Sequence, residues 1–440
     1  MNRPASLSSH FFVPGSRARI SPLTLRPILK VLVASIGFSN IVQSQQPTAR
    51  DTAYLDSVLR AHRYTVTIAN SRLAGDGAPF LIEATKDAQF FMIGESHYVA
   101  EIPRFTAALF ADLHRAHGYN YYAVENGPVI MRSLSSSSIR GNTDRAFAIA
   151  KKYPHAFQFW DDQEIQAYSD IGRISTARTE PLWGLDQEWG ALHVLDRLVE
   201  IAPTKEAQTF ARALSDRARP IETVRPFVLT DVKRFISDAD SASFKELRSK
   251  FRPTRGSEAD FLIDALELSN RVYLHNDAAG RGEVTGYAAN SEREQYMKSR
   301  FMAEYRRAQK EGDSLPRVLL KFGNVHGGDW LSLTYVHTLG EFVHEFAISN
   351  AGKSFHLVAW LLNDPGTYWS IGEDPAYALL ARVGSTKEWT IVDLRPLRDL
   401  WYAGKLKALS AEMRKTMFAF DAVLLVGNGT RGAYDRLRLR

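Results

Sequence analysis

Residues capable of acid–base chemistry follow three apolar runs of this 440-residue sequence. Glu95 and His97 follow the first run, and Glu125 follows the second. His326 follows a much later run, and each of these histidines lies three residues after a glycine. An imidazole beside a carboxylate can take a proton from water, and two imidazoles with a carboxylate can also bind a divalent metal ion. The spacing therefore indicates either general-base catalysis or metal binding.

Glu101 and Arg293 are further candidates for a catalytic role. Glu101 lies four residues after His97, so on a helical turn the two side chains share a face and the carboxylate can orient the imidazole. Its alternative role is to place a negative charge in the first turn of the next helix. Arg293 lies on one stripe of a helix-like segment at 291–305, where it can face an anionic intermediate. Its alternative role is ordinary ion pairing on a solvated helix.

Three residues are candidates for substrate contact. Asp186 and Asn324 each come directly after an apolar run, and Tyr98 adjoins His97. In open α/β sheets, ligands bind beyond the carboxyl ends of the strands, so residues at these positions lie near a ligand. Asp186 can equally cap the helix that follows it. An aromatic ring such as that of Tyr98 suits a bulky or ring-containing ligand.

Common catalytic and nucleotide-binding motifs are missing from the sequence. The segment 94–98 lacks the second glycine of G-x-S-x-G, and no G-x-x-x-x-G-K-[ST], H-E-x-x-H or G-x-G-x-x-G occurs. These absences argue against serine hydrolases, P-loop proteins and zincins. Cysteine is also absent, which excludes disulfides, iron–sulfur ligation and a cysteine nucleophile. Any metal would therefore be bound through His, Asp or Glu.

Short apolar runs alternate with helical patterns along most of the chain. The runs are rich in β-branched and aromatic residues, which is typical of buried strands. They lie at 89–94, 119–124, 181–185, 317–323, 355–362 and 422–427. The segment 103–117 predicts a helix, because it begins with proline, ends before Gly118 and has an apolar face. The pattern predicts one α/β domain at 45–440, with a mostly parallel central sheet flanked by helices and a helical insertion or cap at about 190–310.

The positive charge is concentrated in the first 44 residues. The chain carries 55 Lys and Arg against 49 Asp and Glu, and the segment 1–44 holds five basic residues and no acidic one. It also contains an apolar run at 31–38 followed by small residues, so we predict a signal peptide at 1–44 and a secreted or periplasmic protein. The rest of the chain is nearly neutral and has no apolar segment long enough for a membrane span. This argues against nucleic-acid partners and against an integral membrane segment.

The segment 91–127 resembles the opening signature of the erythromycin esterase family. The resemblance rests on Gly94, Glu95, His97, Glu101 and Glu125. The order and spacing of later segments, including those with Arg293 and His326, are also similar to that family. The resemblance therefore spans about residues 80–430.

This resemblance implies a hydrolase that acts on an ester bond of a small-molecule substrate and requires no cofactor. His97 would act as a general base on water, with Glu95 and Glu125 orienting it. His326 would bind or protonate the substrate, and Arg293 would stabilise the oxyanion. Removal of a general base typically lowers a rate by about 10²–10⁴-fold.

Two alternatives follow from a departure in the signature. The spacing between Glu95 and His97 is one residue shorter than is usual in the esterases. The paired Gly-x-x-His segments are similar to a wider superfamily that includes haem-binding ChaN-like proteins and Tiki- and TraB-like metalloproteases. This second resemblance implies either a metal-dependent peptidase whose ligands are His97, His326 and Glu125, or a haem- or iron-binding protein.

Overall fold

The computed structural model describes residues 47–178, 180–224, 234–283, 286–363 and 370–438. The segment 1–44, which we predict to be a signal peptide, lies outside the described residues. Pro47–Arg440 forms one compact unit. Among the described helices, none is both long and apolar enough to cross a membrane.

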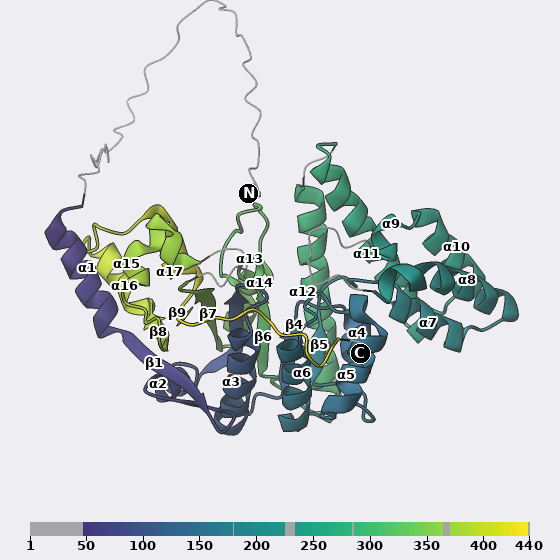
Figure 1. The fold of residues 1–440 in the computed structure, drawn as a ribbon, viewed down its shortest axis with the longest axis horizontal. Coiled ribbons are helices and arrows are strands. Elements are labelled where there is room, and N and C mark those ends of the chain that lie inside the picture. Colours follow the sequence, from purple (N-terminus) through teal and green to yellow (C-terminus); the bar gives the residue numbers. More distant parts are fainter. Residues whose placement is uncertain (1–46, 179, 225–233, 284–285, 364–369, 439–440) are drawn as a thin grey trace, which may run out of the picture. The chain divides into compact units, whose positions relative to one another are not determined.

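In the described part of the chain, nine strands form one sheet in the order β2-β1-β8-β9-β7-β3-β6-β4-β5 (Figure 1). The strands are β1 Arg63–Ala69, β2 Arg72–Ala74, β3 Ala88–Glu95, β4 Tyr121–Val124, β5 Leu182–Gly184, β6 Val318–Gly323, β7 Lys353–Leu361, β8 Trp389–Asp393 and β9 Ala422–Val426. The strands from β9 to β5 in this order pair in parallel, whereas β8, β1 and β2 extend the sheet through antiparallel pairs. The predicted α/β fold with a mostly parallel sheet is confirmed.

The six predicted apolar runs form the six parallel strands. Every residue of β3 and β6 is buried, because helices cover both faces of the sheet. Burial on both faces explains why these runs are continuously apolar. The three antiparallel strands lie outside the predicted runs. In β1, exposed and half-buried residues surround the single buried position, so its apolar side chains form no continuous run.

Helices connect the strands and cover the sheet. They are α1 Ala49–Ala61, α2 Gly77–Ala84, α3 Glu101–His117, α4 Pro128–Ser135, α5 Thr143–Lys152, α6 Asp162–Ile174, α7 Leu192–Ile201, α8 Lys205–Glu222, α9 Phe235–Asp238, α10 Ser241–Phe251, α11 Glu258–Gly280, α12 Tyr287–Lys310, α13 Asn324–Gly327, α14 Leu339–Ser349, α15 Ala378–Ala381, α16 Arg395–Tyr402 and α17 Ala411–Ala419, with short 3-10 turns η1 Pro154–Ala156, η3 Ile371–Glu373 and η4 Pro375–Tyr377. The predicted helix at 103–117 is confirmed as α3. Gly118 ends α3 with a φ of 72°, a left-handed conformation that favours glycine.

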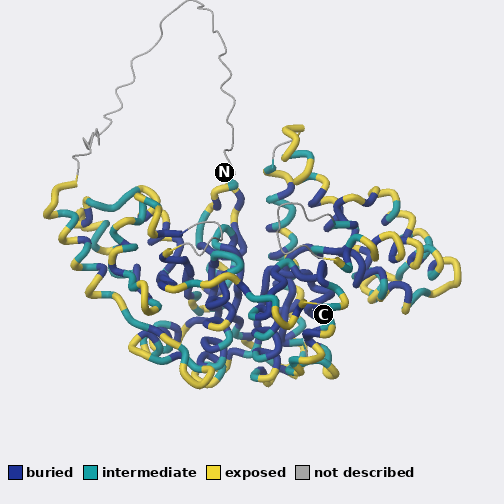
Figure 2. Tube along the Cα trace, viewed as in Figure 1, coloured by how far each residue is buried: buried dark blue, intermediate teal, exposed yellow. Residues whose placement is uncertain are grey.

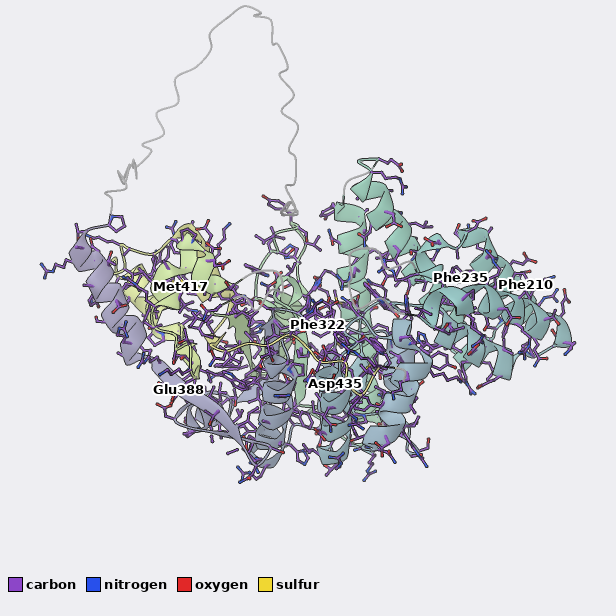
Figure 3. All side chains as sticks on the ribbon, viewed as in Figure 1. Phe210, Phe235, Phe322, Glu388, Met417 and Asp435 are labelled. Carbon is purple, nitrogen blue, oxygen red and sulfur yellow. The ribbon has the colours of Figure 1, made fainter. Side chains whose placement is uncertain are left out.

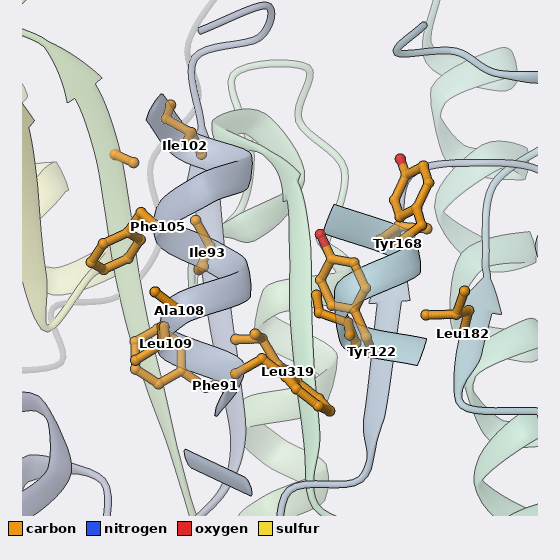
Figure 4. Packing of buried hydrophobic residues seen from close by; sticks show 14 of the residues in the cluster. Phe91, Ile93, Ile102, Phe105, Ala108, Leu109, Tyr122, Tyr168, Leu182 and Leu319 are labelled. Carbon is orange, nitrogen blue, oxygen red and sulfur yellow. The ribbon is translucent and has the colours of Figure 1, made fainter. Parts of the chain in front are cut away.

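The two faces of the sheet pack against different helices. Phe91 and Tyr122 belong to a hydrophobic cluster that includes residues of α3 and α6 (Figure 4). On the other face, Phe90 and Phe322 pack with residues of α12 and α14. Figure 2 shows the strands as buried and the outer sides of the helices as exposed. The sheet is therefore the middle layer of the core.

The stretch at about 190–310 is helical, as the spacing of its apolar residues predicts. It contains α7 to α12, which lie between β5 and β6 in the chain. Phe235 belongs to a hydrophobic cluster formed mainly by α7, α8, α10 and α11, whereas Phe322 belongs to the cluster on the sheet (Figure 3). The helix α12 packs on the sheet through Met297 and Phe301. This packing lets α12 supply side chains to the carboxyl edge of the strands.

Candidate active site

Four neighbouring strands bring the predicted residues to one edge of the sheet. β3 pairs in parallel with β6, so Glu95 lies beside Gly323. β6 also pairs with β4, and β4 pairs with β5, so the carboxyl ends of all four strands lie side by side. The two Gly-x-x-His segments therefore follow adjacent strands, as the sequence predicts. The residues that leave the sheet at this edge include His97, Glu125, Asp186 and His326.

His97 is held by a carboxylate at one ring nitrogen and by an aromatic ring on its face. Its Nδ1 lies 3.1 Å from Glu95 Oε1, and its ring stacks on Phe159 with centroids 4.3 Å apart. Burial opposes ionisation of Glu95, but Lys321 and His97 hold its pKa below the ordinary value. An ionised Glu95 accepts a hydrogen bond, so in the neutral form of His97 the proton lies on Nδ1 and the lone pair on Nε2. The side chain of His97 is 30% exposed, so a substrate can reach it.

Glu125 and His97 both lie against Gly323. A Cβ at Gly323 would come 2.8 Å from His97 Nε2 and 3.3 Å from Glu125 Oε2, so glycine is needed for both groups to approach. Glu125 is buried, and its Oε2 accepts a hydrogen bond from Gly323 N at 2.6 Å. Burial opposes ionisation of Glu125, but the charges of His326 and Arg293 hold its pKa well below the ordinary value. Glu125 is therefore a carboxylate at neutral pH.

Arg293 reaches the site from α12 and links three of its groups. Nε donates to Asp186 Oδ1 at 2.9 Å, and Nη2 donates to Asp186 Oδ2 at 2.5 Å. Nη2 also donates to Glu125 Oε1 at 2.6 Å, and Nη1 lies 3.1 Å from His326 Nε2. The bidentate contact fixes the plane of the guanidinium. Among the described residues, Nε–H and both Nη2–H groups thus donate to carboxylates, and at least one Nη1–H is left for a ligand, because His326 Nε2 can accept from Nη1 only while His326 is neutral.

His326 lies between the guanidinium of Arg293 and the carboxylate of Glu294, which is also on α12. Its Nδ1 lies 2.6 Å from Glu294 Oε1, and Glu294 Oε2 accepts a hydrogen bond from Leu339 N at 2.8 Å. Burial and Arg293 disfavour the imidazolium, but Glu294 and Glu125 outweigh them and raise the pKa of His326. A protonated His326 would direct Nε2–H toward Glu125 Oε1, which lies 3.7 Å away. His326 can therefore hold a proton within the site.

The site does not fit a metal ion bound by His97, His326 and Glu125, the ligands of the metal-dependent alternative. Arg293 contacts both His326 and Glu125, so the positive charge of its guanidinium already takes these donors and opposes a second cation beside them. Within the described residues, no group of three or more His, Asp or Glu side chains is arranged to hold a metal ion. The donor geometry thus gives the metal-dependent alternative no support. No contact tests haem binding, which stays a prediction.

Two residues of the predicted set have partners other than those expected. Glu101 begins α3 and accepts hydrogen bonds from Thr430 N at 2.8 Å and from Thr430 Oγ1 at 2.7 Å. It is therefore Glu95, and not Glu101, that contacts the imidazole. Asp186, predicted to contact the substrate, is fully buried against Arg293. Its carboxylate holds the guanidinium and is not accessible to a ligand.

Tyr98 and Asn324, the other predicted substrate contacts, are half-buried and lie beside the site. Tyr98 has a φ of 63°, which is unusual for a residue other than glycine. Its ring packs edge-on near His97, with centroids 6.2 Å apart. Asn324 is the first residue of α13 and follows β6 directly. Both residues are therefore placed where a ligand at the strand ends can reach them.

Several side chains outside the predicted set of functional residues contact the site, among them Gln158, Phe159, Glu294 and Lys321. Behind them, Glu164 pairs with Lys321. Gln158 donates to Glu125 Oε1 at 3.1 Å, and Lys321 donates to Glu95 Oε1 at 2.7 Å. The sequence does carry a signal for Lys321, because it is the only charged residue in the run 318–323 and a buried lysine is normally paired. The two acidic residues lie on helices, where charged positions are common and carry no such signal.

Solved structures of other proteins share this fold. A His-to-Asn variant of the erythromycin esterase EreC, in its open conformation, matches with a TM-score of 0.57 and 15% identity over 86% of this chain and 100% of that one. A succinoglycan biosynthesis protein matches with a TM-score of 0.56 and 12% identity over 87% of this chain and 98% of that one. A protein from Bacillus cereus matches with a TM-score of 0.51 and 14% identity over 88% of this chain and 99% of that one. No family model and no curated protein matches the sequence.

These similarities concern the fold alone, because the sequence identities are low. Each match covers nearly the whole of the other chain, so the shared part includes the sheet and the helices around it. The sequence-based resemblance to the erythromycin esterase family therefore has a counterpart in three dimensions. This chain has the fold of the erythromycin esterase EreC.

Proposed function

We propose that this protein is a hydrolase in which His97 is the general base for attack of water on an ester bond of a small molecule. The observation that carries the proposal is the contact of His97 Nδ1 with the ionised Glu95, which leaves Nε2 as a proton acceptor. The position at the carboxyl ends of the strands is where ligands bind in such sheets. The fold shared with an esterase supports an ester as the bond that is cleaved.

In the first step, the oxygen of a water molecule attacks the carbonyl carbon of the ester. His97 Nε2 takes one proton from the water, and Glu125 accepts a hydrogen bond from the other. The resulting imidazolium is stabilised by Glu95 at Nδ1. Negative charge develops on the carbonyl oxygen, and the available Nη1–H of Arg293 is the proposed donor to it.

In the second step, the tetrahedral intermediate breaks its bond to the alcohol oxygen. The departing oxygen needs a proton, and we assign this proton to His326, whose raised pKa favours the imidazolium. The products are a carboxylic acid and an alcohol. The proton on His97 then returns to solvent and His326 is protonated again, so the enzyme regains its starting state.

Rings near the base suit a bulky or ring-containing substrate. Phe159 covers one face of His97, and Tyr98 lies near both rings. Tyr98 and Asn324 are the proposed substrate contacts. The substrate is therefore proposed as a class, an ester or lactone of a small molecule.

Replacement of His97 tests this proposal. We expect His97→Ala to lower kcat/KM for p-nitrophenyl esters and lactones by about 10²–10⁴-fold, because it removes the general base. The side chain is 30% exposed, and its removal leaves Glu95 paired with Lys321, so Tm is expected to stay close to that of the wild type. A matched control is His117→Ala, which removes another half-buried imidazole at the far end of α3. Equal activity of the two variants would contradict the assignment.

We also propose that the protein is exported. The support is the sequence of the segment 1–44, which combines basic residues, an apolar run and no acidic residue. Fractionation of cells that produce the full-length chain tests this, with the mature protein expected outside the cytoplasm. Recovery of the uncleaved chain from the cytoplasm would contradict it.

A further inference from the structure

Lys321 is a buried lysine with two carboxyl partners. Its side chain is 1% exposed and lies within β6. Nζ donates to Glu95 Oε1 at 2.7 Å and to Glu164 Oε1 at 2.6 Å. A buried ion pair adds little stability compared with apolar side chains of the same volume. Stability alone therefore does not account for a lysine at this position.

The register of the sheet places Lys321 on the same face as Glu95, the carboxylate that contacts His97. Lys321 pairs with Ile93 of β3, and the alternation of side chains puts both on the same face as Glu95. The helix α6 covers this face and supplies Glu164. Glu95 Oε1 contacts both Lys321 Nζ and His97 Nδ1. A single carboxylate oxygen therefore links the ammonium of Lys321 to the imidazole of His97.

The cluster contains more acidic groups than its one ammonium can neutralise. Asp161 is a third buried carboxyl group, and its Oδ1 accepts a hydrogen bond from Glu164 N at 2.9 Å. Glu164 Oε2 is buried and makes no hydrogen bond of ordinary geometry within the described residues, where the Tyr168 hydroxyl faces the same carboxyl group. A buried oxygen without a well-formed hydrogen bond costs far more on an ionised carboxylate than on a neutral acid. The geometry thus favours a protonated Glu164.

The electrostatics of the surroundings agree with this geometry. The titratable groups that face the cluster are Glu95 on β3, His97 after β3, Tyr122 on β4, and Asp161, Glu164 and Tyr168 on α6 and at its N-cap. Burial raises the pKa of Glu164 to about 8, with the charge of Glu95 acting in the same direction. Glu95, in contrast, has a lowered pKa because it contacts both Lys321 and His97. The surroundings thus favour the ionised form of Glu95 next to the base and the protonated form of Glu164.

We propose that Lys321 is a positioning residue for His97 and that Glu164 is a neutral acid at neutral pH. Lys321 keeps Glu95 ionised, and the ionised Glu95 keeps the proton of His97 on Nδ1. When Glu164 is neutral, Glu95 is the only one of the two carboxyl partners that balances the positive charge of Lys321. The catalytic part of this inference rests on the proposed function of His97, and neither Lys321 nor Glu164 is assigned a contact with the substrate.

Lys321→Met tests the positioning role, because methionine has a similar length and no charge. We expect kcat to fall by about 10²-fold with little change in KM, because the base loses its fixed tautomer. Lys321→Arg keeps the charge and is expected to recover part of the loss. Nitrogen NMR of His97 should show the proton on Nδ1 in the wild type and a mixture of tautomers in Lys321→Met. An unchanged tautomer together with an unchanged kcat would overturn the positioning role.

Glu164→Gln tests the neutral acid, because glutamine has the shape of a protonated glutamate. We expect kcat within about twofold of the wild type. An infrared difference spectrum of the two proteins at neutral pH should show the loss of one protonated-carboxyl band. A fall in kcat as large as that of Lys321→Met, or no loss of such a band, would show that Glu164 is ionised and would overturn its assignment.

The spectroscopic measurements need no turnover, so they separate this inference from the proposed function. If the wild type hydrolyses no ester, the proposed function fails. The tautomer of His97 and the protonated-carboxyl infrared band of Glu164 can still be measured, and they test the inference without any turnover. If Lys321→Met does not fold, the tautomer is read in Lys321→Arg, where a proton retained on Nδ1 supports the role and a mixture contradicts it. The Glu164→Gln band is measured independently of both lysine variants.

Discussion

Gly323→Ala is expected to impair catalysis while the fold stays intact. Gly323 has a φ of −54° and a ψ of 147°, a conformation that alanine adopts without strain. The added Cβ would lie 2.8 Å from His97 Nε2 and 2.9 Å from His97 Cε1. Ordinary contact begins at 3.4 Å, so the imidazole must retreat by about 0.6 Å.

The imidazole cannot make this movement without losing contacts. Phe159 stacks on its face, and Glu95 holds Nδ1. A retreat of Nε2 therefore tilts the ring and moves the proton acceptor away from the attacking water. A misplacement on the ångström scale costs about 10²-fold in rate. His97 is partly exposed and can tilt toward solvent, so we expect a stability cost of only about 1 kcal/mol, the low end for an added methyl group.

The assay compares kcat, KM and Tm of Gly323→Ala with those of a second glycine variant. Gly280→Ala is a suitable control, because a Cβ at Gly280 meets nothing within 4 Å. We expect the control to keep the kcat of the wild type and Gly323→Ala to lose about 10²-fold with a nearly unchanged Tm. A wild-type kcat in Gly323→Ala would refute the argument that Nε2 of His97 acts where the structure places it.

Three further predictions concern charge in and behind the site. Arg293→Lys loses the bidentate contact with Asp186 and leaves Glu125 with a weaker partner, so we expect the free energy of unfolding in urea to fall by about 3 kcal/mol and kcat to fall with it; unchanged values would show that the guanidinium is not needed. The pKa of Glu164 is raised from 4.5 to about 8 on folding. Between these two pH values the folded chain binds more protons than the unfolded chain, so the free energy of unfolding decreases as the pH rises. Glu164→Gln should flatten this decrease, which thermal melts at about pH 5 and about pH 8 would show; a parallel decrease in both proteins would contradict it. Dialysis against a chelator is expected to leave ester hydrolysis unchanged, because the Arg293 guanidinium contacts both His326 and Glu125 in place of a cation. A loss of activity that added zinc restores would favour the metal-dependent alternative.

The parallel strands could be predicted because burial on both faces leaves a continuous apolar run. The run 89–94 is an example, since β3 is buried at every position. In β8, Trp389–Asp393, only Ile391 and Val392 are aliphatic, and β1 has a single buried position, so neither gives a long apolar run. Such strands are specified by their pairing partners, which a local pattern does not show.

The residues of the site could be predicted where their position follows from the end of a strand. His97 and Glu125 are placed by the strand that precedes each of them, so the sequence indicates both. Partners that come together over long separations could not be predicted in this way. Lys321 and Glu164 are 157 residues apart, and the partner of Glu101 is 329 residues away. Such contacts depend on how the helices pack, and no local spacing contains that information.

The order of the strands also sets when the candidate active site is completed during folding. β6 comes after α7 to α12 in the chain, yet it lies between β3 and β4, which are made much earlier. Lys321 and Glu95, on adjacent strands, are 226 residues apart in sequence. Contacts of such long separation form slowly, because the intervening chain must be ordered or closed into a loop first. A nascent chain that ends before β6 already contains Glu95 and Phe159 but lacks Lys321, Gly323 and His326, so the return of the proposed activity during refolding would mark the insertion of β6 into the sheet.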